Sequence, residues 1–368
     1  MIIQRGKKRT WTYSFERGKD ENGDRLREWG SGYPTKKAAQ DAMVEAKSQH
    51  ARGVYIEPSE ILVGEWLKTW LNSRTSIADT TRGGYQYEVN RLTTAFGARK
   101  LQQLTPTAIS GFYRELIQLG LSAKTVKNCA GVFHKALNDA VRDGVLVRNP
   151  ADGVELPRAQ RPEMKVWTAD ELRRFLRYTE SHRLHAAFSL MCTSGMRRSE
   201  LLGINWANID WDNARVAVVD TVVPVDNNPV LRIGETKSKK STRVIALDDT
   251  TLAVLRAHKQ RQNHERIAGG PAYEYQGLVF ANELGGILSP DTFTRTTKRL
   301  AAEAGVPALT PHAARHSWAS IALSQGVAAK VVQERLGHSS IAITLDRYSH
   351  LVDGMDRDAA EVVSALIQ

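Results

Sequence analysis

The chain has 368 residues, which is too long for one compact core of ordinary size and predicts two or three domains. Its 42% hydrophobic and 25% charged residues exclude wholesale disorder, and it has no apolar run of the ~18–20 residues that a membrane span requires. The basic N-terminus lacks the apolar segment of a secretory signal, so a cytoplasmic location is expected, and the net charge of +11 favours a polyanion such as DNA or RNA as partner.

Residues 1–52 are predicted to form a small α+β domain of short strands followed by one helix. Residues 9–16 alternate aromatic and polar side chains with period two, and a turn signal precedes a second strand through Trp29. Thr35 is the expected N-cap of an alanine-rich helix. The alternative to a DNA-binding sheet is that the aromatic side chains are only the core of a small domain. The candidate DNA-binding residues are Lys7, Lys8 and Arg9.

Residues 61–157 are predicted to form an all-α domain. Apolar residues recur at helical spacing from Trp66 onward, Thr105 is the expected N-cap of a second helix, and Ser122 is that of a third. Four helices of about this length would make a compact bundle. On its polar surface Lys124 and Lys127 are candidate DNA-binding residues, and the alternative is a merely solvated face.

The proline-bearing basic segment 148–162 is predicted to separate the bundle from a last domain, residues 163–368. Thr168 and Glu171 form a capping box that opens a helix in this domain. Helical patterns then alternate with apolar strand patterns, so we expect a mixed α+β fold.

Nothing in the sequence predicts a metal site or a cofactor. Cys129 and Cys192 lie far apart inside apolar helical patterns, which predicts buried thiols rather than a disulfide or a zinc site. The G-x-x-x-x-G-K-[ST] pattern of ATP-binding P-loops does not occur.

Four separated segments of the last domain carry residues suited to one anionic site. In the first, a small-residue turn precedes Arg197, and a helix is expected to begin near Ser199. Arginine offers a planar fork of donors that fits two phosphate oxygens, and Glu200 can lock that fork in place. Taken alone, this spacing indicates no more than an ordinary i,i+3 ion pair.

The second segment, residues 235–243, is predicted to be a lysine-rich hairpin tip between two apolar strands. A flexible lysine at such a tip can enter a groove and deliver a proton to a leaving oxygen. Lys237, which is nearest the first strand, is the candidate proton donor, and Lys239 and Lys240 are candidate contacts to a nucleic-acid backbone. Most hairpin tips of this composition are simply soluble turns.

The third segment opens a helix. Thr310 is the expected N-cap and Pro311 the first helical residue, which puts His312 and Arg315 on one face beside uncapped amides. Dipole, imidazole and guanidinium would then converge on an anion. His316 is expected to face inward and support the arrangement; the alternative is a core histidine with a surface arginine.

The fourth segment, residues 336–350, has His338 after a helix-ending glycine and Tyr348 ten residues later. A phenol has an ordinary pKa of about 10, so an attacking tyrosine needs cations that stabilise the phenolate and a base that accepts its proton. The other segments supply both. Attack on a phosphodiester would leave a phosphotyrosyl link that keeps the energy of the broken bond, so the strand could be resealed without ATP.

Together these segments resemble the phage integrase family of tyrosine recombinases. The matching residues are, in chain order, S-G-M-R-R-S-E-L at 194–201, T-K-S-K-K-S-T-R at 236–243, H-A-A-R-H at 312–316 and L-G-H-S-S-I-A-I-T-L-D-R-Y-S-H at 336–350. Each segment alone is a weak signal, whereas all four in this order are highly specific.

The resemblance implies how the phosphate would be held. Arg197 and Arg315 would clamp the scissile phosphate, and His338 would donate a hydrogen bond to it. Lys237 would protonate the departing 5′-hydroxyl, although its lysine neighbours offer substitutes for this role.

The resemblance also implies the covalent step. Tyr348 would be the nucleophile that forms a 3′-phosphotyrosyl intermediate, and His312 would be the base that handles its proton. Glu200 and His316 would support these groups.

Beyond the site, the resemblance implies an architecture and a set of partners. Residues 61–157 would be a core-binding domain that forms a C-shaped clamp on DNA with the catalytic domain, and residues 1–52 resemble, more loosely, the arm-type domain of larger integrases. This layout favours a phage or mobile-element integrase that binds double-stranded DNA at core and arm attachment sites. Such enzymes work as tetramers with an excision factor and often a DNA-bending host protein.

Two other functions remain open from the sequence. A type IB topoisomerase would use the same tyrosine chemistry without exchanging partners, and a DNA-binding regulator would carry these segments for structure alone. A metal-dependent transposase is disfavoured. The apolar stripe after Tyr348, from Ala359 to Ile367, is predicted either to pack on its own domain or to dock on a neighbouring subunit.

Overall fold

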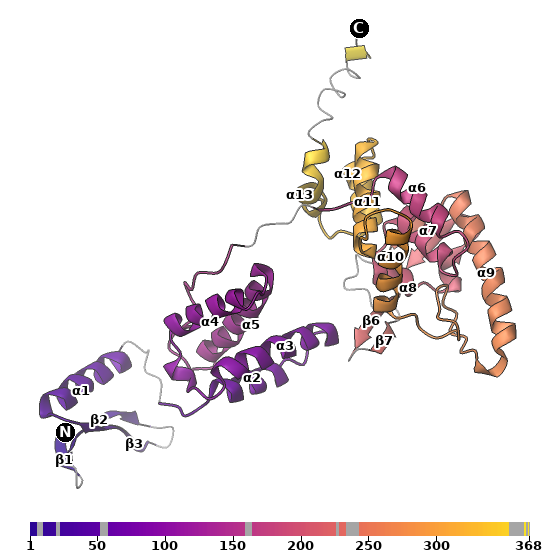
Figure 1. Cartoon of the computed structure of the whole chain (residues 1–368). Helices are drawn as coiled ribbons and strands as arrows, with labels where there is room; N and C mark the ends of the chain where they lie inside the picture. Colours follow the sequence, from indigo (N-terminus) through magenta and orange to yellow (C-terminus); the bar gives the residue numbers. More distant parts are fainter. Residues whose placement is uncertain are drawn as a thin grey trace. The chain divides into compact units, whose positions relative to one another are not determined.

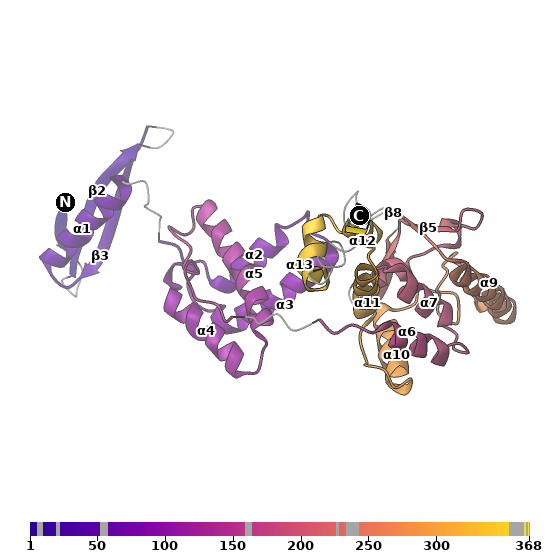
Figure 2. The ribbon, with the colours of Figure 1, turned by 90° about the horizontal axis from the view of Figure 1, so that it is seen from above.

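The structure is a computed structural model that describes residues 1–5, 10–19, 23–51, 58–158, 164–225, 228–232, 243–352, 364, 365 and 367. The chain divides into two compact units, an N-terminal unit of residues 1–160 and a C-terminal unit of residues 161–368. Figure 1 and Figure 2 label the helices and strands of each unit.

The N-terminal unit begins with an antiparallel sheet in the order β1-β2-β3, and α1 packs against it (Figure 1). The bounds are β1 Ile2–Arg5, β2 Thr10–Lys19, β3 Arg25–Tyr33 and α1 Lys36–Ala51. Thr35 Oγ1 accepts a hydrogen bond from the amide of Ala38 at 3.1 Å, which confirms the predicted N-cap. Tyr13 is buried and stacks on Tyr33 with ring centroids 5.8 Å apart, so this aromatic residue belongs to the core. Strand β1 was not predicted, because four residues carry too short a pattern.

Residues 58–158, described without a gap, contain the four helices predicted for the bundle. Their bounds are α2 Val63–Asn72, α3 Asp79–Phe96, α4 Pro106–Gln118 and α5 Ala123–Arg142. Thr105 and Ser122 cap α4 and α5 through their side-chain oxygens, as predicted. The apolar faces meet in one core in which Phe133 stacks on Phe96 at a centroid distance of 5.6 Å. Cys129 is buried in this core as a free thiol.

The C-terminal unit mixes helices with short strands, as predicted. Its helices are α6 Ala169–Tyr178, α7 His185–Ser194, α8 Arg198–Leu202, α9 Asp249–Gly269, α10 Pro290–Glu303, α11 Pro311–Ser324, α12 Ala329–Leu336 and α13 Ile341–Val352. The capping box of Thr168 and Glu171 opens α6, which confirms that prediction. Helix α8 begins beside Ser199, also as predicted.

The strands that the structure describes in this unit form two small antiparallel sheets. Their bounds are β4 Ile209–Asp210, β5 Arg215–Val218, β6 Thr221–Val225, β7 Asn228–Arg232 and β8 Arg243–Ala246. The sheets have the orders β4-β5-β8 and β6-β7. The described strands on either side of the predicted hairpin tip pair with different partners, β7 with β6 and β8 with β5. Residues 235–242 of that tip lie outside the described residues.

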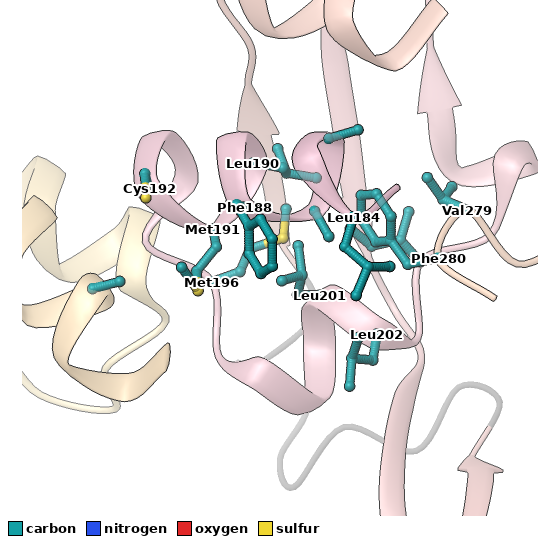
Figure 3. Packing of buried hydrophobic residues seen from close by; sticks show 14 of the residues in the cluster. Leu184, Phe188, Leu190, Met191, Cys192, Met196, Leu201, Leu202, Val279 and Phe280 are labelled. Atoms are coloured by element: carbon teal, nitrogen blue, oxygen red, sulfur yellow. The ribbon is translucent and has the colours of Figure 1, made fainter. Parts of the chain in front are cut away.

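The core of the C-terminal unit gathers around α7. Figure 3 shows Phe188 and Met191 of α7 turned toward the apolar side chains of α8, among them Leu201. Phe188 also stacks on Phe293 of α10 with centroids 5.5 Å apart. The thiol of Cys192 is free and buried, as predicted. Among the described residues, no helix is both long and apolar enough to cross a membrane.

Candidate active site

The guanidinium of Arg315 joins three segments of the C-terminal unit. Its Nη1 donates to the carbonyl of Gly195 at 2.8 Å, and its Nη2 donates to the carbonyl of Leu336 at 2.7 Å. Arg315 lies on α11, Gly195 follows α7, and Leu336 ends α12. The residue is only 2% exposed, so the predicted anion-binding arginine is buried at the point where these segments meet.

Arg197 reaches the same place from the start of α8. Its Nη1 donates to Glu200 Oε1 at 2.6 Å, its backbone amide donates to Glu200 Oε2 at 2.8 Å, and its Nη2 donates to the carbonyl of Gly337 at 2.9 Å. The side chain of Glu200 is 3% exposed, whereas that of Arg197 is 37% exposed. Glu200 therefore holds the Arg197 fork as expected, and the fork remains accessible from solvent.

Two glycines allow these segments to approach one another. Gly195 ends α7 with φ +69°, and a Cβ there would lie 2.8 Å from Leu336 Cδ2. Gly337 ends α12 with φ +66°, and a Cβ there would lie 3.0 Å from Arg243 Nη1. A side chain at either position would meet backbone strain, and it would also clash with Leu336 at Gly195 and crowd Arg243 at Gly337.

Two further arginines belong to the cluster and were missed by the sequence reasoning. Arg243, the first residue of β8, donates from Nη1 and Nη2 to the two oxygens of Glu200 at 3.1 and 2.8 Å. Arg335, in the last turn of α12, donates to the carbonyl of Thr193 at 3.0 Å and lies 4.9 Å from the ring centroid of Trp318. Arg243 ends the motif T-K-S-K-K-S-T-R, in which only the lysines were considered, so that motif held the available signal.

The arginines outnumber the carboxylates in this cluster, and their positive charge shifts the pKa values of its members. Burial raises the pKa of Glu200, but hydrogen bonds and charge from Arg243, together with the charge of Arg197, outweigh burial and hold that pKa below its ordinary value. Burial, followed by the charge of Arg197, lowers the pKa of Arg315 to about 9. Arg315 is thus a cation at neutral pH whose charge would be favoured by an arriving anion.

Tyr348 lies inside the helical layer formed by α11, α12 and α13. It is fully buried at 0% exposure, among apolar residues that include Leu323, Val332 and Leu336. Its hydroxyl shares a hydrogen bond of 2.6 Å with His316 Nδ1. In the tautomer with its proton on Nε2, the Nδ1 of this imidazole accepts a hydrogen bond from the phenolic hydroxyl. The inward orientation predicted for His316 is therefore observed.

His312 lies beside His316, and His338 contacts the helix that carries Tyr348. The ring of His312 meets that of His316 edge to face with centroids 4.5 Å apart, and His312 itself is exposed at the start of α11. Pro311 is the first residue of that helix, as predicted, although the side chain of Thr310 makes no capping hydrogen bond. His338 Nδ1 shares a hydrogen bond of 2.8 Å with Thr344 Oγ1 of α13.

The remaining candidate residues divide into two groups. Lys124 and Lys127 are exposed on α5, and their binding of DNA stays a prediction.

The described residues hold no group of three or more His, Cys, Asp or Glu side chains arranged for a metal ion. The candidates that lie outside the described residues are Lys7, Lys8, Arg9, Lys237, Lys239 and Lys240.

Comparison with known proteins identifies the class of this site. A model described as "Phage integrase family" matches residues 165–354, more than half of the chain. A tyrosine recombinase XerC-like protein of Caldanaerobacter subterraneus subsp. tengcongensis is 29% identical over 370 residues, covering 95% of this chain and 94% of the relative. An integrase of Streptomyces ambofaciens is 26% identical over 374 residues, covering 98% and 95%. The chain therefore belongs to the phage integrase family, and the predicted enzyme class, a tyrosine-type site-specific recombinase, is confirmed.

Solved structures share the fold. The Tn1549 transposon integrase in complex with transposon right end DNA superposes with a TM-score of 0.70 at 19% identity, covering 81% of this chain and all of that one. A lambda integrase dimer bound to a COC′ core site gives a TM-score of 0.60 at 19% identity, covering 94% of each chain. The fold is thus that of recombinase integrases, with mixed α/β content and a small N-terminal sheet.

Proposed function

We propose that the protein is the integrase of a phage or another mobile element, which cuts and rejoins DNA strands through a 3′-phosphotyrosyl intermediate. The observation that carries this proposal is the convergence of Arg197 and Arg315 on the adjacent carbonyls of Leu336 and Gly337. Leu336, whose carbonyl accepts from Arg315, packs in the same buried cluster as Tyr348, so a nucleophile and two phosphate-binding forks belong to one site.

In the cleavage step, Tyr348 Oη attacks the phosphorus while the bond from phosphorus to the 5′-oxygen breaks. The phenolic proton passes to the histidine pair, with His312 as the base and His316 in contact with the hydroxyl. Lys237 supplies the proton for the departing 5′-oxygen. The guanidiniums stabilise the charge that builds up on the phosphoryl oxygens, and His338 adds a hydrogen bond. Attack by a 5′-hydroxyl reverses every step, so no ATP is consumed.

The buried tyrosine defines this conformation as a resting state. Because Tyr348 is fully buried, a DNA phosphate reaches its hydroxyl only after α13 shifts. That shift separates the Tyr348 hydroxyl from His316 Nδ1 or carries both to the phosphate. Bound DNA favours the shifted state, since its phosphate interacts with the phenol only there.

Three domains divide the work on DNA. Residues 1–52 bind arm sites, residues 61–157 bind the core site and close a clamp with the catalytic residues 163–368, and four copies assemble on the paired sites. Support comes from the separate β1–β3 sheet and from the exposed Lys124 and Lys127 on α5. An excision factor and a DNA-bending host protein set the direction of the reaction.

The decisive experiment is capture of the covalent adduct. The protein is incubated with nicked duplexes drawn from the DNA that adjoins its gene, and denaturing gels are scored for protein–DNA adducts and for recombinant joints between two sites. We expect both products with the wild type and neither with Tyr348→Phe, which keeps the ring but removes the nucleophile. Relaxation of supercoils without joints would indicate a topoisomerase, and the absence of adduct on every duplex would contradict the proposal.

A further inference from the structure

We propose that Arg243 is a positioning residue for strand cleavage. It holds Glu200 in place, so that the guanidinium of Arg197 is correctly oriented toward the phosphate and its positive charge is not cancelled. The inference rests on the proposed function, because it concerns the chemical step of that reaction. Arg243 has none of the roles assigned above, and its hydrogen bonds to Glu200 and to the carbonyl of Arg335 lead to groups that surround the phosphate-binding forks.

The first support is the geometry of the Arg243 guanidinium. All three of its nitrogens donate within the cluster, with Nη1 and Nη2 on the carboxylate of Glu200 and Nε on the carbonyl of Arg335 at 2.7 Å. The side chain is 8% exposed, and its backbone is fixed by the pairing of β8 with Val218 of β5. Arg243 thereby ties Glu200 to the end of α12, two residues before the glycine whose carbonyl accepts from Arg197.

The second support is that one carboxylate serves two guanidiniums. Glu200 Oε1 accepts from Arg197 and from Arg243, and Oε2 accepts from the Arg197 amide and from Arg243. Both oxygens are thus fully used, and the carboxylate cannot rotate without losing a bond to one partner. A loose carboxylate would let the Arg197 fork move, and displacements of about 1 Å at such groups cost on the order of 100-fold in rate.

The third support is the charge count of this trio. Glu200 alone would cancel the charge of Arg197 in a one-to-one pair. With Arg243 present, the three side chains retain one net positive charge, and Arg197 is the accessible member that a phosphate can approach. Arg243 therefore keeps the field at Arg197 attractive to an anion without touching the anion itself.

A purely structural role is the competing explanation, and the chain offers a matched control for it. Arg183 makes the same kind of fork, donating from Nε and Nη2 to Glu265 at 2.8 Å each, and it also donates to the carbonyls of Ala281 and Asn282. Arg183→Lys and Arg243→Lys both keep the charge and lose the fork. They should lower the melting temperature of the protein by comparable amounts, but only Arg243→Lys should slow cleavage.

The test measures single-turnover adduct formation on nicked DNA at saturating protein, beside DNA affinity and melting temperature. We expect Arg243→Lys to lower the cleavage rate about 10–100-fold with little change in affinity. On a duplex with sulfur in place of the bridging 5′-oxygen, the leaving group needs no proton. Arg243→Lys should lower the cleavage rate of this duplex, relative to the wild type, by the same factor. Adding Glu200→Gln should cause little further loss, because both changes break one fork.

Several outcomes would overturn the inference. They are a wild-type cleavage rate in Arg243→Lys, a loss confined to affinity, equal slowing in Arg183→Lys, full rescue by the sulfur-bridged duplex, or an Arg243→Lys protein without a cooperative melting transition. Rescue by sulfur would show that Arg243 acts on leaving-group protonation, and a missing transition would assign it to stability alone. If the wild type forms no adduct, the proposed function fails instead, so the two failures are distinguishable.

Discussion

Within the described residues, each unit has a buried carboxylate that bonds to two arginines, and the two clusters differ in their charge balance. In the N-terminal unit, Asp139 of α5 accepts from the indole of Trp70 at 2.6 Å, pairs with Arg74 and accepts from Arg142 at 2.7 Å. In the C-terminal unit, Glu200 pairs with Arg197 and Arg243. Both carboxylates are nearly inaccessible, so burial alone does not distinguish them.

The clusters around Asp139 and Glu200 differ in their numbers of arginines and carboxylates. Arg142 also donates to Asp143 at 3.1 Å, so two carboxylates face two arginines around Asp139, and the cluster joins α2 to α5. Around Glu200, Arg315 adds a third guanidinium that feels the charges of Arg197 and Arg243. On the proposed function, the balanced cluster serves the fold, whereas the excess of positive charge around Glu200 serves the DNA phosphate at a cost in stability.

The largest expected effect compares the two carboxylates directly. Glu200→Gln should cost about 3–5 kcal/mol of unfolding free energy, because it leaves Arg243 buried beside an uncharged amide. Asp139→Asn should cost about 1–2 kcal/mol, since the side chain of Arg142 is 66% exposed and turns to water. Urea unfolding, with each loss assigned to its unit by hydrogen exchange, measures both values. Equal losses would show that charge balance is not what separates the clusters.

The next effect separates catalysis from stability. Arg315→Gln should lower the single-turnover rate of adduct formation about 10²–10³-fold, which corresponds to about 3–4 kcal/mol of transition-state stabilisation. Arg142→Gln removes a guanidinium from the balanced cluster and should leave this rate unchanged at saturating protein. A comparable loss of rate in both variants would mean that the excess charge has no special role in the reaction.

In these clusters, contacts between residues close in the sequence could be predicted, and contacts between distant residues could not. The link from Arg197 to Glu200 spans three residues in a helical start, and the caps at Thr105 and Thr168 are equally local, so spacing alone predicted them. The fork of Arg243 on Glu200 joins residues 43 apart and depends on which strand β8 pairs with. No periodicity encodes that choice.

The tyrosine shows the same limit. Its position ten residues after His338 could be interpreted from the sequence, and the family motif gave its chemistry. Its full burial and its bond to His316 arise from the packing of α13 on α11, which depends on many weak apolar contacts. Sequence reasoning therefore named candidate groups for the site but not the conformation in which Tyr348 lies.

The buried side chain of His258 contrasts with these two charged clusters because burial keeps it neutral. His258 of α9 shares a hydrogen bond of 2.7 Å with the carbonyl of Val279, while Arg261 donates to its other ring nitrogen at 2.9 Å. Burial lowers the pKa of His258 from 6.5 to about 4, with the charge of Arg261 acting in the same direction. The unfolded chain thus binds more protons between these values, and stability present above pH 6.5 is lost as the pH falls toward 4.

The expected loss is about 3 kcal/mol over that window. His258→Gln can still donate to the carbonyl and should flatten the pH dependence of the unfolding free energy between pH 6.5 and 4. The pKa of Glu200 is held below 4.5, so its own contribution is lost below about pH 4.5 and overlaps only the acid end of this window. An unchanged slope in the variant would contradict the assignment to His258.

The smallest effect tests whether the excess charge binds an oxyanion in the absence of DNA. Sulfate has the charge and geometry of a phosphate group, so it should stabilise the C-terminal unit through Arg197 and Arg315, by about 1.4 kcal/mol at ten times its dissociation constant. Sulfate also stabilises proteins by exclusion from their surface, but that contribution is common to all variants. The informative quantity is therefore the difference between variants in melting shift, with chloride at matched ionic strength as reference. Arg197→Gln should lose most of the sulfate-induced melting shift, and Arg142→Gln should keep it, because only Arg197 belongs to the cluster in which guanidiniums outnumber carboxylates. Equal shifts in the two variants would mean that this cluster does not recognise an oxyanion by itself.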